Sequence, residues 1–183
     1  MENKSIILIT CGHFDKSITT SIVNDIQQLF HYPVVVRECS FDLANFYDAG
    51  RRQYNANQVM KLVSERVPYY AFKAMGVFQV DLFIPILTYI FGQAVLNGNI
   101  GIASLYRLRN ELYGLPPNHL LMIERLRKVV IHELGHTFGL IHCQTTNCIM
   151  RSSTYVEDID QKALRFCPSC QEKLQIKRSE QDL

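Results

Sequence analysis

The sequence predicts an α+β protein with a twisted, mixed and mainly parallel sheet plus helices, and two observations support this fold class. Apolar β-branched runs alternate with stretches of helical periodicity in the first part of the chain, which is the order expected of parallel strands joined by helices. Further along, Asn97-Gly98-Asn99 separates two apolar segments, and such a turn signal predicts a hairpin. We therefore expect a sheet that ends in a hairpin at one edge.

Strands and helices are predicted in turn through the first third of the chain. Residues 5–10 form a continuous, mostly β-branched run, and 33–38 contain Val34-Val35-Val36, which favours two strands, the first of them buried on both faces. Apolar residues recur at helical spacing within 15–30 and 56–66, which predicts two helices. The stretch 42–55 has no clear period, so we expect a loop or a short helix there.

The middle of the chain is expected to complete the sheet. Residues 69–83 predict one or two further strands, with Gly76 as a bend or turn. Residues 89–96 and 100–108 flank the turn at Asn97 and are expected to form the hairpin.

The longest predicted helix opens at Pro116-Pro117-Asn118 and ends near Phe138, where Gly139 supplies a stop. Its apolar residues recur at spacings of three and four and are Ile123, Leu126, Val130, Leu134 and Phe138. This stripe should pack on the sheet. His132 and His136 fall on the other side of the helix, which is free to face a cleft.

Composition and net charge give no sign of a nucleic-acid or membrane partner. The chain has 183 residues, enough for one domain with its own core. Its formal net charge of +2 at pH 7 is close to neutral, so we expect neither nucleic acid nor an anionic membrane as the main partner.

No targeting segment or membrane span is predicted. Residues 5–10 are an apolar run too short for a signal peptide core, and the apolar stretch 77–96 is interrupted by Asp81, Pro85 and Gln93. We therefore expect a cytoplasmic protein with reduced thiols.

The segment from His132 to His142 carries the main functional signal. His132 and His136 are four residues apart on the predicted helix, so both imidazoles can reach one metal ion. Gly139 can adopt a left-handed conformation and turn the chain, which brings His142 back as a third ligand. Three protein ligands leave one position open for water, as in a catalytic zinc site.

Glu133 directly follows the first of these histidines and is expected to act as catalytic base rather than as a ligand. Zinc lowers the pKa of the water that it binds to near 7, so Glu133 can take a proton from this water at neutral pH. The resulting nucleophile attacks a carbonyl, and Glu133 passes the proton to the leaving amine.

Four of the six cysteines lie close together near the end of the sequence. Cys143 and Cys148 form one pair, Cys167 and Cys170 form another, and their spacing is typical of a structural zinc site. Cys143 adjoins His142, and adjacent residues in an extended chain point to opposite sides, so each can face its own metal. The alternative is that these are reduced free thiols and that the protein binds one metal.

The histidine and cysteine patterns together resemble the archaemetzincins, a family of metzincin-type zinc metallopeptidases. The resemblance rests on residues 125–170, including Cys143, Cys148, Met150 and the Cys167-Pro168-Ser169-Cys170 pair. The gap between Met150 and Cys167 is one residue shorter than in the family pattern. The resemblance implies a zincin-like fold divided by an active-site cleft, a structural zinc at the cysteines, and Met150 in the turn beneath the catalytic zinc.

We therefore expect one zincin-like catalytic domain over residues 1–183, with an N-terminal subdomain (1–139) and a small zinc-stabilised subdomain (140–183). The expected function is a zinc metallopeptidase with two zinc ions that hydrolyses peptides or proteins. Two alternatives stay open: a catalytically silent zinc-binding or sensing module, and a zinc hydrolase of non-peptide amides or esters.

Other conspicuous residues are given no catalytic role. His13, His31 and His119 have no partner at ligand spacing. Tyr155 follows Met150 at a spacing that differs from that of the tyrosine some metzincins use in catalysis. The charged cluster 125–128 is expected to lie on a solvated face.

Overall fold

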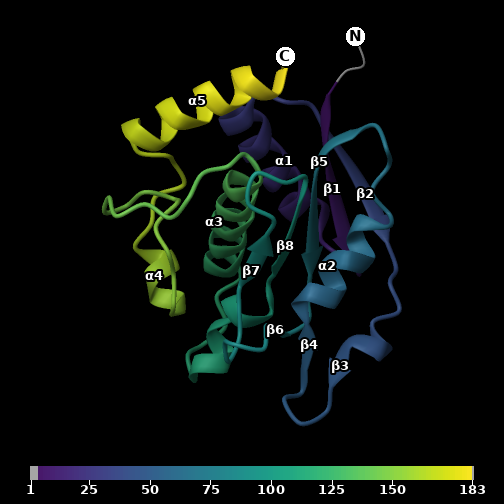
Figure 1. Cartoon of the computed structure of the whole chain (residues 1–183). Coiled ribbons are helices and arrows are strands. Elements are labelled where there is room, and N and C mark those ends of the chain that lie inside the picture. Colours follow the sequence, from purple (N-terminus) through teal and green to yellow (C-terminus); the bar gives the residue numbers. More distant parts are fainter. Residues whose placement is uncertain (1–3, 183) are drawn as a thin grey trace.

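The computed structural model describes residues 4–182 and contains a five-stranded sheet with helices on both faces (Figure 1). The strand order is β2-β1-β5-β8-β7. The bounds are β1 (Ser5–Cys11), β2 (Val34–Cys39), β5 (Ala71–Phe78), β7 (Gly92–Ala94) and β8 (Ile100–Ser104). All neighbours pair in parallel except β7, which forms an antiparallel hairpin with β8 at the edge. The predicted mainly parallel sheet with an edge hairpin is confirmed.

The five α-helices are α1 (Lys16–Phe30), α2 (Ala56–Ser64), α3 (His119–Thr137), α4 (Val156–Asp160) and α5 (Pro168–Asp182). Alternate side chains of β1 explain how they are arranged, because successive residues of a strand point to opposite faces. Ile6 and Leu8 join a core with α1 and α3, whereas Ile7 and Ile9 join a second core with α2. Both faces of the sheet are therefore buried.

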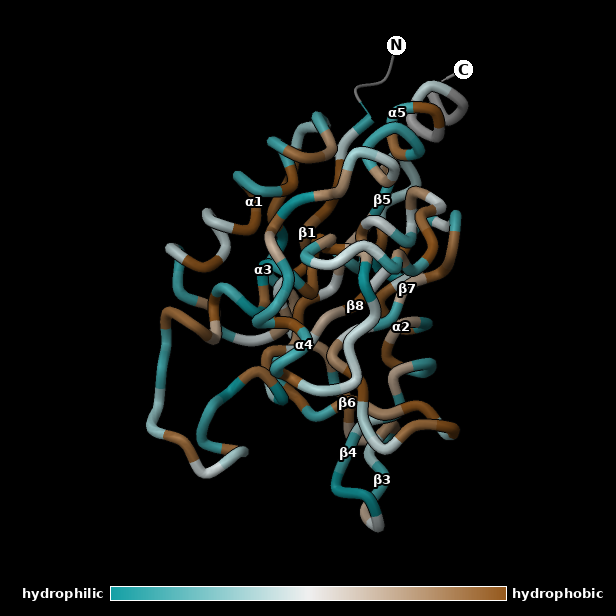
Figure 2. Tube along the Cα trace, turned by 90° about the vertical axis from the view of Figure 1, so that its left-hand side faces the viewer, coloured by the Kyte–Doolittle hydropathy of each residue, from teal (hydrophilic) through white to brown (hydrophobic). Residues whose placement is uncertain are grey.

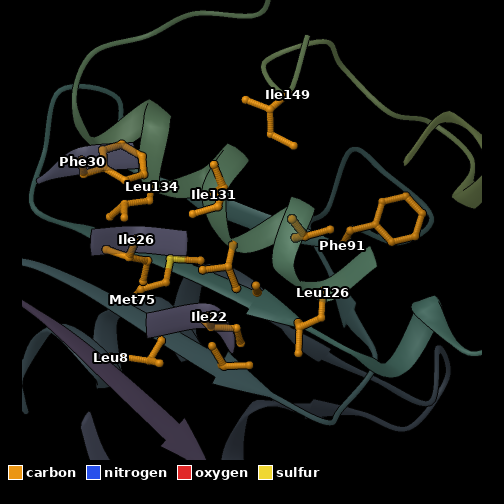
Figure 3. Packing of buried hydrophobic residues seen from close by; sticks show 14 of the residues in the cluster. Leu8, Ile22, Ile26, Phe30, Met75, Phe91, Leu126, Ile131, Leu134 and Ile149 are labelled. Carbon is orange, nitrogen blue, oxygen red and sulfur yellow. The ribbon is translucent and has the colours of Figure 1, made fainter. Parts of the chain in front are cut away.

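The larger core fixes α3 between the sheet and the C-terminal segment. Figure 3 shows its packing, with Leu126, Ile131 and Leu134 of α3 beside Ile22 and Ile26 of α1 and Leu8 and Met75 of the sheet. In Figure 2, α1 alternates hydrophobic and hydrophilic positions along its turns, as expected of a helix with one face on this core.

Residues 42–55 contain more structure than the sequence predicted. A short 3₁₀ helix (Ala44–Phe46) leads into β3 (Tyr47–Asp48) and β4 (Gln53–Asn55), which pair with β6 (Leu82–Phe83) as a second, three-stranded sheet. These strands have two or three residues each, too few for a periodic signal. The antiparallel pair β3–β4 projects from the lower end of the molecule in Figure 1.

The predicted bend at Gly76 is wrong. Strand β5 runs through Gly76 without interruption, and the chain leaves the strand only after Phe78. A side chain at Gly76 would come within 3.0 Å of the Phe78 ring and 3.3 Å of Ile102. The glycine therefore serves close packing rather than a turn. The second strand of the edge hairpin also ends earlier than expected, at Ser104, and two 3₁₀ turns follow it.

Helix α3 begins where the sequence suggested but is buried over more of its circumference. The Asn118 side chain accepts a hydrogen bond from the Leu121 N–H and caps the first turn. The prediction that cluster 125–128 lies on a solvated face is wrong, because Arg125 and Lys128 are each 3% exposed.

Carboxylates on neighbouring elements account for this burial. Arg125 forms two hydrogen bonds, of 2.7 and 2.6 Å, to Asp160 of α4. Arg127 pairs in the same way with Asp25 of α1. Charges that are paired and hydrogen-bonded can be buried at acceptable cost.

Within residues 4–182, no helix is long and apolar enough to cross a bilayer.

Candidate functional site

The structure brings His132, His136 and His142 together at the C-terminal half of α3. His132 and His136 lie one helical turn apart, and Gly139 (φ +87°) turns the chain after the helix so that His142 returns to them. The three ring centroids lie 4.7, 5.3 and 4.9 Å apart. One potential ligand atom from each histidine lies within 4.8 Å of the others.

Backbone carbonyls fix which ring nitrogen of two histidines carries the proton. The Nδ1 of His132 lies 2.8 Å from the Ile149 carbonyl oxygen, and that of His136 lies 2.7 Å from the Leu140 carbonyl oxygen. A carbonyl only accepts, so each Nδ1 must donate and each Nε2 carries a lone pair. These two Nε2 atoms face each other at 3.1 Å, an arrangement that repels unless a cation lies between them.

The donor set fits zinc. Two nitrogens bound to one tetrahedral zinc at the usual bond length lie about 3.3 Å apart, close to the observed separation. Burial lowers the pKa of each of the three histidines below its usual value. The imidazoles are therefore neutral, which is the form that binds metal.

Glu133 lies beside this cluster and is 7% exposed. Burial raises the pKa of its carboxyl group to about 8, against the opposing effect of Lys162. Its side chain packs so tightly on the edge strand that a Cβ at Gly92 would lie 2.7 Å from the Glu133 Cγ. Only glycine at this position leaves room for the carboxylate.

A cavity of about 410 Å³ opens beside Glu133. Its lining comes from residues 87–92, which lead into β7, from α3, from His142 and from the segment 152–162. The lining includes Leu87, Ile90, Phe91, Gly92, Lys128, Val129, His132, Glu133, His142, Tyr155, Ile159 and Lys162. The side of α3 opposite the predicted apolar stripe therefore faces a cavity, as expected.

Met150 lies beneath the histidines and is fully buried. A side chain at Gly135, in the turn of α3 between His132 and His136, would come within 2.5 Å of the Met150 sulfur. The Met150 carbonyl also accepts a hydrogen bond from the Cys143 N–H. Met150 thus packs against the helix at Gly135.

The four C-terminal cysteines form a second cluster, with their sulfur atoms within 4.8 Å of one another. The Sγ atoms of Cys143 and Cys167 are 3.7 Å apart, too far for a disulfide of about 2.05 Å. Two sulfurs on one tetrahedral zinc lie about 3.8 Å apart, so the spacing fits this ion.

The thiols of the cluster differ in acidity: burial raises the pKa of Cys148 and of Cys170, whereas hydrogen bonds favour the thiolate form of Cys167. Burial acts to raise the pKa of the Cys167 thiol, but hydrogen bonds from the Cys170 backbone and from Thr145 outweigh it and hold the pKa at about 6. The Cys167 N–H in turn donates to the Cys148 sulfur. Thiolate is the form in which cysteine binds zinc.

The two clusters share one short segment of chain. Cys148 belongs to the cysteine cluster, the carbonyl of Ile149 orients His132, and Met150 packs under the histidines. The Ile149 N–H is itself fixed by the Arg165 carbonyl. Such outer-shell hydrogen bonds orient ligands and tune metal affinity.

The residues that received no role at the sequence level lie mostly apart from this centre. His119 is exposed and lies 3.9 Å from Asp15. Tyr155 lines the cavity but is 64% exposed. Cys11 and Cys39 are register partners in β1 and β2, away from both clusters.

Two lysines of the cavity, Lys128 and Lys162, were missed by sequence reasoning. Burial lowers the pKa of Lys162 to about 8, while Glu133 and Asp158 oppose this shift. No local pattern marks Lys162, because it approaches Glu133 only through the fold.

The architecture and the histidine cluster define a class: this chain is a zinc metallopeptidase with a zincin-like α+β fold. The model of peptidase family M54 matches residues 34–176, and the chain belongs to this family, the archaemetzincins. The family suggested by the sequence resemblance is therefore confirmed.

Individual relatives agree with this assignment. The archaemetzincin of Sulfolobus acidocaldarius is 39% identical over 175 residues, covering 93% of this chain and 96% of that protein. Among solved structures, the archaemetzincin of Methanopyrus kandleri superimposes with a TM-score of 0.84 at 29% identity, covering 97% of each chain. A zinc-dependent peptidase of Methanocorpusculum labreanum gives a TM-score of 0.83 at 27% identity, covering 92% of this chain and 99% of that one.

Proposed function

We propose that this metallopeptidase binds two zinc ions with different tasks. His132, His136 and His142 would hold a catalytic ion, and Cys143, Cys148, Cys167 and Cys170 a structural one. The 3.1 Å approach of two unprotonated histidine nitrogens supports the first site. The 3.7 Å sulfur separation supports the second. Three nitrogen donors leave one position of a tetrahedron for substrate or water, whereas four sulfurs complete it.

Glu133 is proposed as the general base and acid of peptide hydrolysis. Zinc, when bound, polarises the scissile carbonyl and makes a water molecule acidic enough to react at neutral pH. Glu133 accepts the proton of the attacking water and delivers it to the nitrogen of the leaving amine. Burial raises the pKa of the Glu133 carboxyl group, and the positive charge of a bound zinc ion would lower it again, which favours the carboxylate that accepts the proton.

The edge strand β7 is proposed to align the substrate. Among the described strands, β7 pairs only with β8, so its other edge is available to an extended peptide. Gly92 lies on this strand against Glu133, so a peptide paired with β7 would pass beside the carboxylate. This geometry favours a peptide over a compact amide or ester.

The rival proposal is a zinc module without turnover. A silent site is expected to carry a fourth protein ligand or to lack access. Within residues 4–182 the ligand group at the histidines contains no fourth histidine, cysteine, aspartate or glutamate, and the adjoining cavity reaches His132, His142 and Glu133. Both observations favour catalysis.

The test combines zinc content with turnover. Zinc is measured by mass spectrometry in wild type and in Glu133→Gln, purified without added metal, and both are incubated with a mixed peptide pool whose new termini are identified. Two zinc ions per chain are expected in each protein. Turnover should fall about 10²- to 10⁴-fold in Glu133→Gln and stay unchanged in the control Glu65→Gln, an exposed residue after α2.

Retained turnover in Glu133→Gln would rule out its role as general base. A single zinc that leaves only on unfolding would support the cysteine site alone and favour the silent module. Turnover of esters or short amides in the absence of any peptide cleavage would favour the other alternative.

A further inference from the structure

Lys162 is a buried cation in the wall of the active-site cavity. It lies just after α4 and is 7% exposed, yet it lines the same cavity as Glu133 and His142. Buried lysines are rare unless they are paired, because removing an ammonium group from water is costly.

The other lysine of the cavity, Lys128, already has partners. Its Nζ lies 2.7 Å from the Glu124 carboxylate one turn earlier on α3, and it also approaches the Asp160 carbonyl oxygen at 3.4 Å. Lys128 is therefore largely neutralised by its own surroundings.

Lys162 differs from Lys128 in this respect. Its ammonium makes no hydrogen bond or ion pair with any group that the structure describes. The nearest acidic influences are Glu133 and Asp158. Asp158 Oδ2 already accepts the backbone N–H groups of Thr154 and Tyr155, at 2.8 and 2.9 Å. Glu133 is the proposed catalytic base. The ammonium thus retains donors that no described side chain uses, on a residue that lines the cavity.

The position of Lys162 places it close to the reaction centre. It lines the same cavity as His132, Glu133 and His142. Apolar side chains of the same cavity, including Ile90, Val129 and Ile159, line the rest of the wall. Such a cavity suits a group with a short apolar stem and an anionic end.

We infer that Lys162 binds a carboxylate of the peptide substrate, so that the enzyme prefers substrates with a carboxylate beside the scissile bond. The inference rests on the proposed peptidase function and adds a substrate class to it. The carboxylate can belong to an aspartate or glutamate side chain or to a free C-terminus. A charge-assisted hydrogen bond to the ammonium would favour either one over a neutral amide.

The competing explanation is that Lys162 serves only as a counter-ion that positions Glu133. In that case its removal would change binding of all ligands alike, with no discrimination between a carboxylate and a carboxamide. The two explanations therefore differ in a ratio of affinities rather than in overall activity.

The experiment measures binding of peptide hydroxamates to the zinc-loaded protein by calorimetry. Two probes share one backbone and a C-terminal amide and differ only in an aspartate or asparagine side chain. Two others carry an alanine side chain and end in a free carboxylate or an amide. They are titrated into wild type, Lys162→Met, Lys162→Gln and Lys162→Arg, with Lys61→Met as control because Lys61 is an exposed lysine of α2.

In wild type, one carboxylate probe should bind about 10- to 100-fold more tightly than its amide partner. The pair that shows the preference identifies the source of the carboxylate. The preference should fall to near one in Lys162→Met and Lys162→Gln, and should persist in Lys162→Arg and Lys61→Met. Zinc content and thermal unfolding verify that each variant is folded.

Equal binding of both members of each pair to wild type would overturn the inference and leave the peptidase proposal standing. An unchanged preference in the folded Lys162 variants would overturn it too. Equal losses for acid and amide probes would assign Lys162 to Glu133 as a counter-ion. Failure of every hydroxamate to bind would instead overturn the proposed function, and the inference with it.

Discussion

The histidine cluster and the cysteine cluster lie next to each other in the chain but are built by different means. Two histidines are carried by the C-terminal half of a long, buried helix, and their geometry follows from helical spacing. The cysteines come from a loop and from the start of α5, with little regular structure between them. We therefore propose that the first site is held by the fold, whereas a metal at the second site would hold part of the fold together.

This difference predicts which observable each site controls. The segment 140–167 contains only the short helix α4, so few backbone hydrogen bonds of regular structure hold it, and it relies on its core side chains, such as Ile149 and Phe166, and on the cysteines. Loss of its metal should reduce stability. Loss of the histidine-bound metal should abolish chemistry and leave the sheet and α3 largely intact.

The largest effect is expected for Cys167→Ser. Removing one of four ligands should release the structural zinc and lower the free energy of unfolding by roughly 5 kcal/mol, since metal binding contributes directly to folding. The melting temperature should fall by about 10–20 °C. Calorimetry and zinc content check this, with Cys39→Ser as a control that lies outside the cluster. An unchanged melting temperature after loss of one zinc would mean that the fold holds this segment unaided.

A second prediction concerns Gly92→Ala, which should separate chemistry from metal binding. The new Cβ would overlap the Glu133 side chain and the Ile102 carbonyl oxygen, so Glu133 must move. We expect kcat/KM to fall on the order of 10- to 100-fold, because misplaced catalytic groups lose their orientation, while both zinc ions stay bound.

The control for Gly92→Ala is Gly50→Ala on the β3–β4 turn, where the nearest atom is the flexible end of Asp48 at 3.3 Å. Full activity in Gly92→Ala would contradict the tight packing of Glu133 on β7. Loss of zinc in this variant would mean that β7 supports the ligands rather than the base.

A smaller effect is expected for Lys73→Met, which probes the end of the active-site helix. The Lys73 ammonium donates to the carbonyl oxygens of Thr137 and Gly98, at 3.0 and 2.7 Å, and thereby ties α3 to the edge hairpin. Its removal should cost about 1 kcal/mol at neutral pH, measured by urea unfolding against Lys61→Met. A cost as large as that of Cys167→Ser would erase the distinction between the two regions.

The same residue gives a pH dependence with a defined sign. Burial lowers the pKa of Lys73 from 10.5 to about 8, with a contribution from Lys4. The unfolded chain then binds more protons than the folded one between these values, so the stability of wild type relative to Lys73→Met should rise as the pH increases from 8 to 10.5. A relative stability that falls over this interval would contradict the assignment.

The sequence predicted those features that depend on local spacing. His132 and His136 meet because one helical turn brings them together, and Gly139 adopts the expected positive φ. The structure also groups the four cysteines, although their role as zinc ligands stays a prediction. The division at residue 139 into two subdomains is likewise a prediction.

What the sequence could not reveal depends on contacts between distant segments. Arg125 was expected on a solvated face because its partner Asp160 lies on another helix. Gly76 was assigned to a bend because its neighbours Ile102 and Val63 are remote in the chain. Lys162 has no motif at all and reaches Glu133 only in the folded protein.

The carbonyl of Ile149 has a consequence for the order in which the protein matures. This carbonyl fixes His132, and it lies one residue after Cys148, which belongs to the cysteine cluster. We therefore expect the thiolates to capture their ion first, and the histidines to become competent only afterwards. Refolding with cobalt should show sulfur-to-metal absorption before the bands of a nitrogen-bound ion, and simultaneous appearance would contradict this order. A cell short of zinc would then accumulate structurally complete but inactive enzyme, which becomes active when the second ion arrives.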